Sequence, residues 1–359
     1  MKYGGKYWNI KKYLPYQRCF NFITSERTIG KTYTTQGFFL ERAIEKEKEK
    51  FVYFVRNEDE LKKHVFADAF EKVANVEFPE YKFNFKTDKA YLVEEPGFNE
   101  ELEVTSVQIE PKLIGHAIAL SAANKNKKRN FPFCKWGMLD EYIVDEKGTS
   151  TYVNGWNEPD LLLSLYHTID REQDYFTIFL LANVIQFYNP YHLHPAFNIP
   201  KIDKGIIWKS ENVLYHQAEA TEELKEEKAK CKFLRMIQET QYGTYAKQGE
   251  FIHDNYNFLA ERPERARYKF TLLFKNMELA IWSHPSSPKL YIDESIDKSC
   301  KTRYALSYDD HDEDSVLSKR QSILLRNLAL NFQKGRVYFK SMEVKAKAED
   351  AIKFILGGK

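Results

Sequence analysis

The chain has 359 residues, of which 43% are hydrophobic and 30% charged, so it is long enough for two globular domains with a sizeable core in each. Its 54 basic residues nearly cancel its 52 acidic ones, and a net charge of +2 does not by itself indicate a nucleic-acid-binding protein. The longest apolar run, around residues 176–185, is too short to cross a bilayer, and the first residues lack the apolar core of a secretory signal. The four cysteines form no paired motif, which argues against a zinc knuckle or a disulfide framework and favours a reducing cytosol without membrane partners.

Residues 18–24, RCFNFIT, predict a buried strand that leads directly into the segment SERTIGKT. In the phosphate-binding pattern G-x-x-x-x-G-K-[ST], the glycines let backbone N–H groups approach a phosphate. The lysine of that pattern binds the β- and γ-phosphates, and the hydroxyl binds Mg²⁺. Gly30, Lys31 and Thr32 keep the second half of the pattern, whereas Ser25 replaces the first glycine.

This loop lies between the predicted strand and a helix expected at 31–47, whose N-terminal dipole favours a phosphate. We therefore predict binding of ATP and Mg²⁺ rather than a simple glycine turn. The loop residues expected to bind ATP are Ser25, Glu26, Arg27, Thr28, Ile29, Gly30, Lys31 and Thr32. Arg27 stands at a position that needs no side chain to hold phosphate, so its charge is available to the γ-phosphate, to a partner subunit or to solvent.

Short apolar runs and helical patterns alternate from residue 18 to about 205, which is typical of an α/β fold with a mostly parallel sheet. After the first strand and helix, further strands are expected at 51–56, 82–93, 116–122, 134–140 and 174–183. Further helices are expected at 59–74 and 159–169. We assign these elements to an N-terminal domain over residues 1–207.

Two adjacent acids, Asp140 and Glu141, end the predicted strand at WGMLDEY. The first carboxylate is suited to the Mg²⁺ of a phosphate-binding loop, and the second to a general base for the attacking water. Taken alone, such a pair is more typical of a turn. With the phosphate-binding loop upstream, we interpret Asp140 as a metal residue and Glu141 as catalytic.

Asn183 and Arg171 flank the next predicted strand. Asn183 ends the buried run IFLLAN, and ligands of open α/β sheets bind at the carboxyl edge, so we expect this amide to contact the γ-phosphate or the water. Arg171 follows a predicted helix, where it is either a surface residue or an arginine that reaches the nucleotide of a neighbouring subunit.

The second half of the chain changes in composition. Residues 208–244 are charged and helical in pattern, which predicts a helical linker, and residues 245–359 predict a second α/β domain. This domain is expected to hold strands near 268–274, 278–284 and 289–295 and helices at 315–333 and 343–356. The basic run at 125–129 is interpreted either as a solvated loop or as a site for nucleic acid.

The ordered motifs ITSERTIGKTY, FVYFVR, LDEY, HTIDRE and LLANVIQFYNPY resemble the genome-packaging ATPases of small short-tailed phages, the group whose motor includes a packaging RNA. The resemblance covers most of the chain, including TQYG, GEFI and KLYID, and is looser in the C-terminal half. It implies an ASCE-type P-loop ATPase, terminase-like, working in the host cytoplasm. It also implies a homo-oligomeric ring, a pentamer, that docks on the portal of a prohead and moves double-stranded DNA inward.

The resemblance also implies roles for individual residues. Lys31 and Glu141 take catalytic roles, Thr32 and Asp140 hold Mg²⁺, and Arg171 acts in trans. The residues expected to contact DNA are Lys125, Lys127, Lys128 and Arg129, of which Lys127 falls near a basic residue that the family points into the central pore. Flexible lysines that meet phosphates give the sequence-independent grip a translocating motor requires. Ser25 and Thr28 depart from the family pattern but leave the lysine and the hydroxyl in place, so nucleotide binding is expected to be retained with an altered affinity.

For the C-terminal domain, the resemblance implies an α+β fold of the RNase H type, a vestigial nuclease that binds nucleic acid without cutting it. An alternative is a terminase large subunit with an active nuclease built on Asp293 or on the acidic cluster at 309–314, because such enzymes need several carboxylates on two metal ions. We interpret that cluster as a solvated loop. A third hypothesis is a nucleotide-gated scaffold that binds nucleic acid and hydrolyses ATP slowly.

Overall fold

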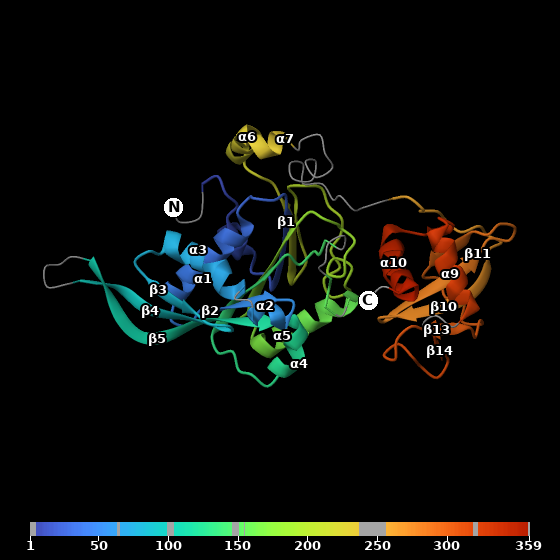
Figure 1. Cartoon of the computed structure of the whole chain (residues 1–359), viewed down its shortest axis with the longest axis horizontal. Helices are drawn as coiled ribbons and strands as arrows, with labels where there is room; N and C mark the ends of the chain where they lie inside the picture. The colour runs from blue at the N-terminus through green and yellow to red at the C-terminus, as the bar shows by residue number, and fades with distance from the viewer. Residues whose placement is uncertain are drawn as a thin grey trace. The chain divides into compact units, whose positions relative to one another are not determined.

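The computed structural model describes residues 5–62, 65–98, 104–145, 151–153, 155–236, 256–318 and 322–357. The chain divides into two compact units, Met1–Ile252 and His253–Lys359, which are described separately below (Figure 1). Among the described residues, no helix combines the length and the apolar character needed to cross a membrane.

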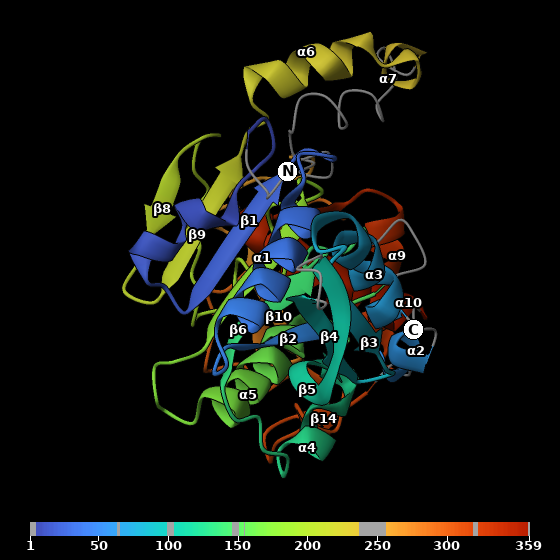
Figure 2. The ribbon, with the colours of Figure 1, turned by 90° about the vertical axis from the view of Figure 1, so that its left-hand side faces the viewer.

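A nine-stranded sheet forms the centre of the first unit, with the strand order β3-β4-β5-β2-β6-β7-β1-β9-β8. The six strands from β5 to β9 in that order are parallel, and the sheet is antiparallel only at its two edges (Figure 2). The predicted parallel-rich α/β fold is therefore confirmed for this unit. In sheet order the strands are Lys82–Phe85, Lys89–Phe98, Val104–Ala119, Lys50–Val55, Cys134–Asp140, Thr177–Asn183, Phe20–Ser25, Val213–Ala218 and Ile207–Lys209.

Helices cover both faces of this sheet. On β2, Phe51 and Tyr53 pack into one core, to which helices α1 (Lys31–Glu45) and α3 (Val65–Glu77) contribute. The alternating residues of β2 pack into a second core on the other face, with helix α5 (Glu158–Asp170). Strands buried on both faces need apolar residues at every position, which is why these segments are recognisable in the sequence as continuous apolar runs.

Several shorter elements complete the first unit. They are the helices α2 (Glu58–Lys62) and α4 (Ala123–Asn126) and the 3₁₀ turns Ile10–Lys12, Leu14–Tyr16, Leu120–Ala122 and Gly155–Asn157. The described residues of the helix predicted at 59–74 belong to α2 and α3, and residues 63–64 lie outside the described part of the chain. The single strand predicted at 82–93 is the antiparallel pair β3 and β4, because the chain reverses between Phe85 and Lys89, where the Lys86 N–H donates to the Lys89 carbonyl.

The helical linker predicted for residues 208–244 is wrong over its first part. Strand β9 pairs in parallel with β1 from Phe20 opposite Val213 to Ser25 opposite Ala218, so it belongs to the main sheet. Burial of its apolar residues overrides the charged composition of the surrounding segment. Helices α6 (Glu222–Lys230) and α7 (Lys232–Met236) follow it, and the boundary predicted at 244 lies outside the described residues.

The second unit holds a six-stranded sheet with the order β14-β13-β10-β11-β12-β15. In this order the strands are Val316–Leu317, Arg303–Ala305, Arg267–Phe274, Met277–Ser283, Leu290–Asp293 and Val337–Phe339. Helices α9 (Ile323–Gln333) and α10 (Met342–Leu356) supply apolar side chains to its core. The helix predicted at 315–333 begins only at residue 323, because the Ser322 hydroxyl caps it by accepting from the Leu324 N–H.

Candidate functional site

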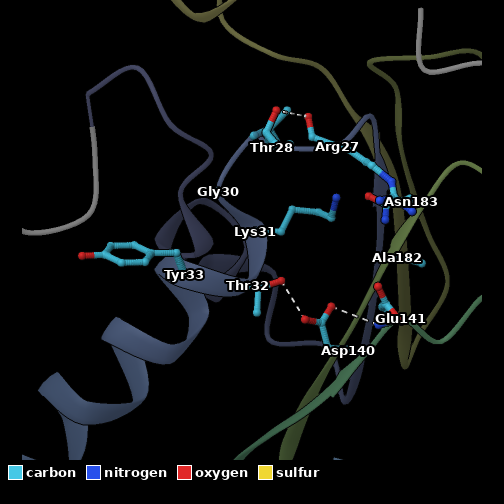
Figure 3. A pocket seen from close by; sticks show the side chains of 11 residues that line it. Arg27, Thr28, Gly30, Lys31, Thr32, Tyr33, Asp140, Glu141, Ala182 and Asn183 are labelled. Carbon is cyan, nitrogen blue, oxygen red and sulfur yellow. Dashed lines mark hydrogen bonds between the residues drawn. The ribbon is translucent and has the colours of Figure 1, made fainter. Parts of the chain in front are cut away.

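Three strand tips meet at the carboxyl edge of the large sheet. In the register of the parallel strands, Ser25 of β1 lies opposite Asn183 of β7, and Asp140 of β6 lies opposite Leu181 of β7. Next to these tips is a cavity of about 330 Å³ (Figure 3). Its lining residues are Arg27, Thr28, Ile29, Gly30, Lys31, Thr32, Tyr33, Asp140, Glu141, Ala182 and Asn183. The structure thus brings most of the residues predicted to bind or act on ATP around one space.

Helix α1 begins at this cavity with its N-terminal N–H groups uncapped. Gly30 is the N-cap residue at φ 93°, and no side chain caps the helix. A left-handed backbone at this position favours glycine, since it has no Cβ. The uncapped N–H groups of the first turn, together with the helix dipole, suit an anionic ligand such as a phosphate.

Thr28 also adopts a left-handed backbone, with φ 64°. A β-branched residue in this conformation is strained by about 1–3 kcal/mol. We expect Thr28→Gly to have a free energy of unfolding about 1 kcal/mol higher than Thr28→Ala, because alanine keeps the Cβ that disfavours this backbone. Urea unfolding of the two variants checks this, and equal stabilities would show that the loop is unstrained.

Lys31 extends from the start of α1 toward the strand tips (Figure 3). Its side chain is buried, with the ammonium donating to the Ser25 hydroxyl at 2.5 Å and lying 3.4 Å from the Glu26 carbonyl oxygen. Burial lowers the pKa of Lys31 to about 8, although the nearby Asp140 carboxylate acts in the opposite direction. A buried cation so poorly compensated, beside a cavity, fits a ligand that brings negative charge, as a triphosphate does.

Thr32 and Asp140 form the part of the site suited to Mg²⁺. The Thr32 hydroxyl donates to Oδ2 of Asp140 at 2.7 Å, and burial raises the pKa of the Asp140 carboxyl. Mg²⁺ is usually bound in proteins by one or two carboxylates together with phosphate oxygens of the substrate. A hydroxyl and a carboxylate held side by side at a phosphate-binding loop therefore fit this ion.

Glu141, which directly follows β6, and Asn183, the last residue of the neighbouring strand β7, line the same cavity. Glu141 is exposed and has φ 54°, and its N–H donates to Oδ1 of Asp140 at 2.9 Å. Arg27 is exposed on the loop, and its side chain runs toward Asn183 in Figure 3. The carboxylate, the amide and the guanidinium thus lie where a terminal phosphate and its attacking water are expected.

Ser25 and Glu26 were predicted to contact ATP, but both are buried outside the cavity lining. Ser25 accepts the Lys31 hydrogen bond, so its side chain supports the lysine instead. The Glu26 carboxylate pairs with Lys228 of α6 at 3.4 Å, and the Lys228 ammonium also donates to the Arg27 carbonyl at 2.6 Å. Helix α6 is therefore attached to the phosphate-binding loop.

Three residues at or beside this cavity, Lys228, Tyr33 and Ala182, are not predicted from the sequence. Lys228 is one of many charged residues in its segment, and nothing in their spacing distinguishes it. Tyr33 follows the motif directly but matches no pattern, and its hydroxyl donates to Glu77 at 2.8 Å. Ala182 precedes Asn183 in the strand, so only its neighbour could have suggested it.

Replacing Lys228 should destabilise the protein because it leaves the Glu26 carboxylate buried and unpaired. We expect Lys228→Met to lower the free energy of unfolding by about 3 kcal/mol, and the double variant Lys228→Met/Glu26→Gln to recover most of it. Lys225→Met is the control, since Lys225 is on the same helix in an exposed pair with Glu222 and should cost less than about 0.5 kcal/mol. Chemical denaturation of the wild type, Lys228→Met, Glu26→Gln and the double variant measures the coupling, and additive losses from the two single variants would contradict it.

Comparison with known proteins decides the family. A family model described as "Podovirus DNA encapsidation protein (Gp16)" matches residues 4–354. The chain belongs to this family. The "DNA packaging protein" of Bacillus phage B103 is 29% identical over 331 residues, covering 91% of this chain and 94% of that protein. The "DNA packaging protein" of Bacillus phage phi29 is 29% identical over 342 residues, covering 94% of this chain and 95% of that protein.

Solved structures agree with this assignment. A chain of "The bacteriophage Phi-29 viral genome packaging motor assembly" matches with a TM-score of 0.68 and 27% identity, covering 98% of this encapsidation protein and 100% of that chain. A chain of the Phi-28 DNA packaging motor matches with a TM-score of 0.65 and 21% identity, covering 99% of each, which is evidence for the fold alone.

Arg171 does not line the cavity at the start of α1 in its own chain. It is the exposed C-cap residue of α5, and the Asp170 carboxylate beside it accepts from the N–H groups that lead into the start of β7. Arg171 therefore lies toward the amino edge of the sheet, whereas the cavity is at the carboxyl edge. Together with Lys127 it lines a separate surface hollow of about 640 Å³.

The four basic residues predicted to contact DNA differ in their surroundings. Lys125 lies 2.9 Å from the Glu58 carboxylate, and Arg129 lies 3.1 Å from the Asp88 carboxylate. Lys127 and Lys128 are exposed. Surface ion pairs are weak enough to exchange for phosphate contacts, so the structure leaves all four as candidates.

No observation favours an active nuclease in the second unit. Asp293 is buried, and its carboxylate accepts from Arg262 at 2.8 Å, from Trp282 at 3.0 Å and from the Ser295 N–H at 2.8 Å. The Arg262 guanidinium also stacks on the Trp282 ring. Across the described ranges of the chain, no group of three or more His, Cys, Asp or Glu side chains is arranged to hold a metal ion.

Proposed function

We propose that this encapsidation protein is the ATPase of a phage DNA-packaging motor, which hydrolyses ATP to move double-stranded DNA into a prohead in the host cytoplasm. The observation that carries the proposal is the convergence of Lys31, Asp140 and Glu141 on one cavity at the start of α1. Membership of a DNA encapsidation family supplies the substrate class, and the match to a packaging-motor chain at 27% identity supports the assembly.

In the proposed mechanism, the uncapped N–H groups of α1 and the Lys31 ammonium hold the β- and γ-phosphates of ATP. Thr32 and Asp140 would hold Mg²⁺, which would supply positive charge to the phosphates. Glu141 accepts a proton from the attacking water, and Asn183 orients that water or the γ-phosphate. Because Lys31 belongs to α1, and Asp140 and Asn183 end strands of the sheet, these three groups are positioned before the substrate arrives.

Arg171 completes the site of a neighbouring subunit in a ring, which we take to be a pentamer. Its exposed position away from its own nucleotide cavity supports action in trans, where an arginine stabilises the charge of the transition state. Arg171→Ala and Glu141→Gln subunits, each inactive alone, should regain partial ATPase activity when mixed, because some interfaces then combine an intact Arg171 with an intact Glu141. A mixing series measures this, and no recovery at any ratio would count against action across the interface.

The ring is proposed to dock on the portal and packaging RNA of the prohead, with residues 125–129 toward DNA in the pore. The C-terminal unit is proposed to be a vestigial nuclease of the RNase H type that binds nucleic acid. In support, β10, β11 and β12 are antiparallel, and β13 and β14 add in parallel on the other side of β10. A domain can keep this arrangement of strands without the carboxylates that bind metal ions in a nuclease.

The test of this function is DNA-dependent ATP turnover together with packaging. Purified protein added to cognate proheads with ATP should protect double-stranded DNA from added nuclease, and Glu141→Gln protein should not. The nucleotide-gated scaffold predicts a different result, in which Glu141→Gln leaves DNA-stimulated turnover intact. Plasmid nicking with Mn²⁺ that is lost in Asp293→Ala would revive the nuclease alternative.

A further inference from the structure

A buried ion pair lies at the carboxyl end of β2, outside the lining of the nucleotide cavity. It joins Arg56, which directly follows β2, to Glu158, the first residue of α5. Both carboxylate oxygens of Glu158 lie 3.2 Å from the Arg56 Nε, and Glu158 is 0% exposed. Glu158 also accepts from the Tyr191 hydroxyl at 2.8 Å and from the Val153 N–H at 2.6 Å.

This pair reaches the residue next to Glu141. The Arg56 guanidinium donates to the Tyr142 carbonyl at 3.0 Å, while the Tyr142 N–H donates to the Leu181 carbonyl of β7 at 3.1 Å. The Tyr142 hydroxyl is hydrogen-bonded to Nε2 of His192 at 2.7 Å, and Tyr142 is fully buried. Tyr142 is thus held at its carbonyl, its amide and its hydroxyl.

Glu141 itself is exposed and has the unusual backbone angle φ 54°, so little besides its neighbours fixes where its carboxylate points. Asp140 on one side is held by Thr32, and Tyr142 on the other side is held by this network. We propose that Glu158 is a positioning residue, which acts through Arg56 and Tyr142 to hold the Glu141 carboxylate at the nucleotide cavity. This inference rests on the proposed role of Glu141 as general base.

The physical argument is that Glu158 is the buried counter-charge of Arg56. Without that charge, the guanidinium has a lower free energy when it turns toward solvent than when it stays hydrogen-bonded to the Tyr142 carbonyl. A displacement of about 1 Å in a catalytic group lowers a rate by up to about 10²-fold, even when substrate binding is unaffected.

We expect Glu158→Gln to lower kcat for ATP about 10- to 100-fold, with KM for ATP changed less than twofold. Glu49→Gln is the matched control, because Glu49 also pairs with an arginine, the half-buried Arg42 at 2.8 Å, but directly precedes β2 at the amino edge of the same sheet. It should lose stability without a comparable loss of kcat. Tyr191→Phe removes one donor to Glu158 with little risk to folding, and should lower kcat about 3- to 10-fold.

A double variant separates positioning of Glu141 from a general structural role. In the Glu141→Gln background, adding Glu158→Gln should lower the rate of single-turnover hydrolysis by less than about a further twofold. The reason is that Glu158 acts through the Glu141 carboxylate, which this background already lacks. Equal fold losses in both backgrounds would overturn the inference. So would folded Glu158→Gln and Tyr191→Phe proteins with kcat within twofold of wild type. If wild-type protein hydrolyses no ATP, the proposed function fails instead.

Discussion

Lys31→Met is expected to abolish ATP hydrolysis, with a loss of at least about 10³-fold in kcat/KM. The Lys31 ammonium is the buried cation at the start of α1, and a preorganised charge of this kind stabilises the transferring phosphoryl group far more than water does. Steady-state ATPase assays measure the loss, and circular dichroism confirms folding. A folded variant with turnover near wild type would contradict the assignment of this loop.

Lys31→Met should also change how the free energy of unfolding depends on pH. Burial lowers the pKa of Lys31 to about 8 from 10.5, so between these pH values the unfolded chain binds more protons than the folded chain. The wild type should therefore gain stability relative to Lys31→Met as pH rises from 8 to 10.5, by roughly 3 kcal/mol. Below pH 8 the variant should be at least as stable as the wild type. Parallel urea unfolding across this range measures the difference, and a constant difference would show that Lys31 is not buried as a charge.

Glu141→Gln is expected to lower kcat at least about 10³-fold while ATP binding is retained. The amide keeps the size of the side chain and its place at the end of β6, but it cannot accept a proton from water. Nucleotide binding by equilibrium titration should be within a few-fold of wild type. Loss of binding together with turnover would assign Glu141 to substrate binding instead.

Asp140→Asn provides the comparison, because it changes the adjacent carboxylate in the same way. Asp140 accepts from the Thr32 hydroxyl and is assigned to Mg²⁺, so this variant should need a higher Mg²⁺ concentration for half-maximal activity. The requirement of Glu141→Gln for Mg²⁺ should be unchanged. If both variants shift the Mg²⁺ dependence equally, the two carboxylates share one role.

Much of the first unit could be predicted from local sequence. Strands β2, β6 and β7 are largely apolar because helices cover both faces, and such runs are recognisable without tertiary information. The loop between β1 and α1 could be found because phosphate binding requires particular residue types at fixed spacing. Strand β9 could not, since a short strand followed by a charged helix differs little from a linker until its pairing with β1 is known.

The sequence by itself determined which residues are proposed to carry the chemistry: Gly30, Lys31 and Thr32 at motif spacing, and Asp140 and Glu141 at a strand end. Only the tertiary structure decided how they are supported, because hydrogen bonds between distant segments leave no local pattern. Lys228 lies 201 residues from Arg27, and Arg56 lies 102 residues from Glu158, yet each pair meets directly. A phosphate-binding motif needs its residues close in sequence, whereas a buried ion pair needs them close only in space.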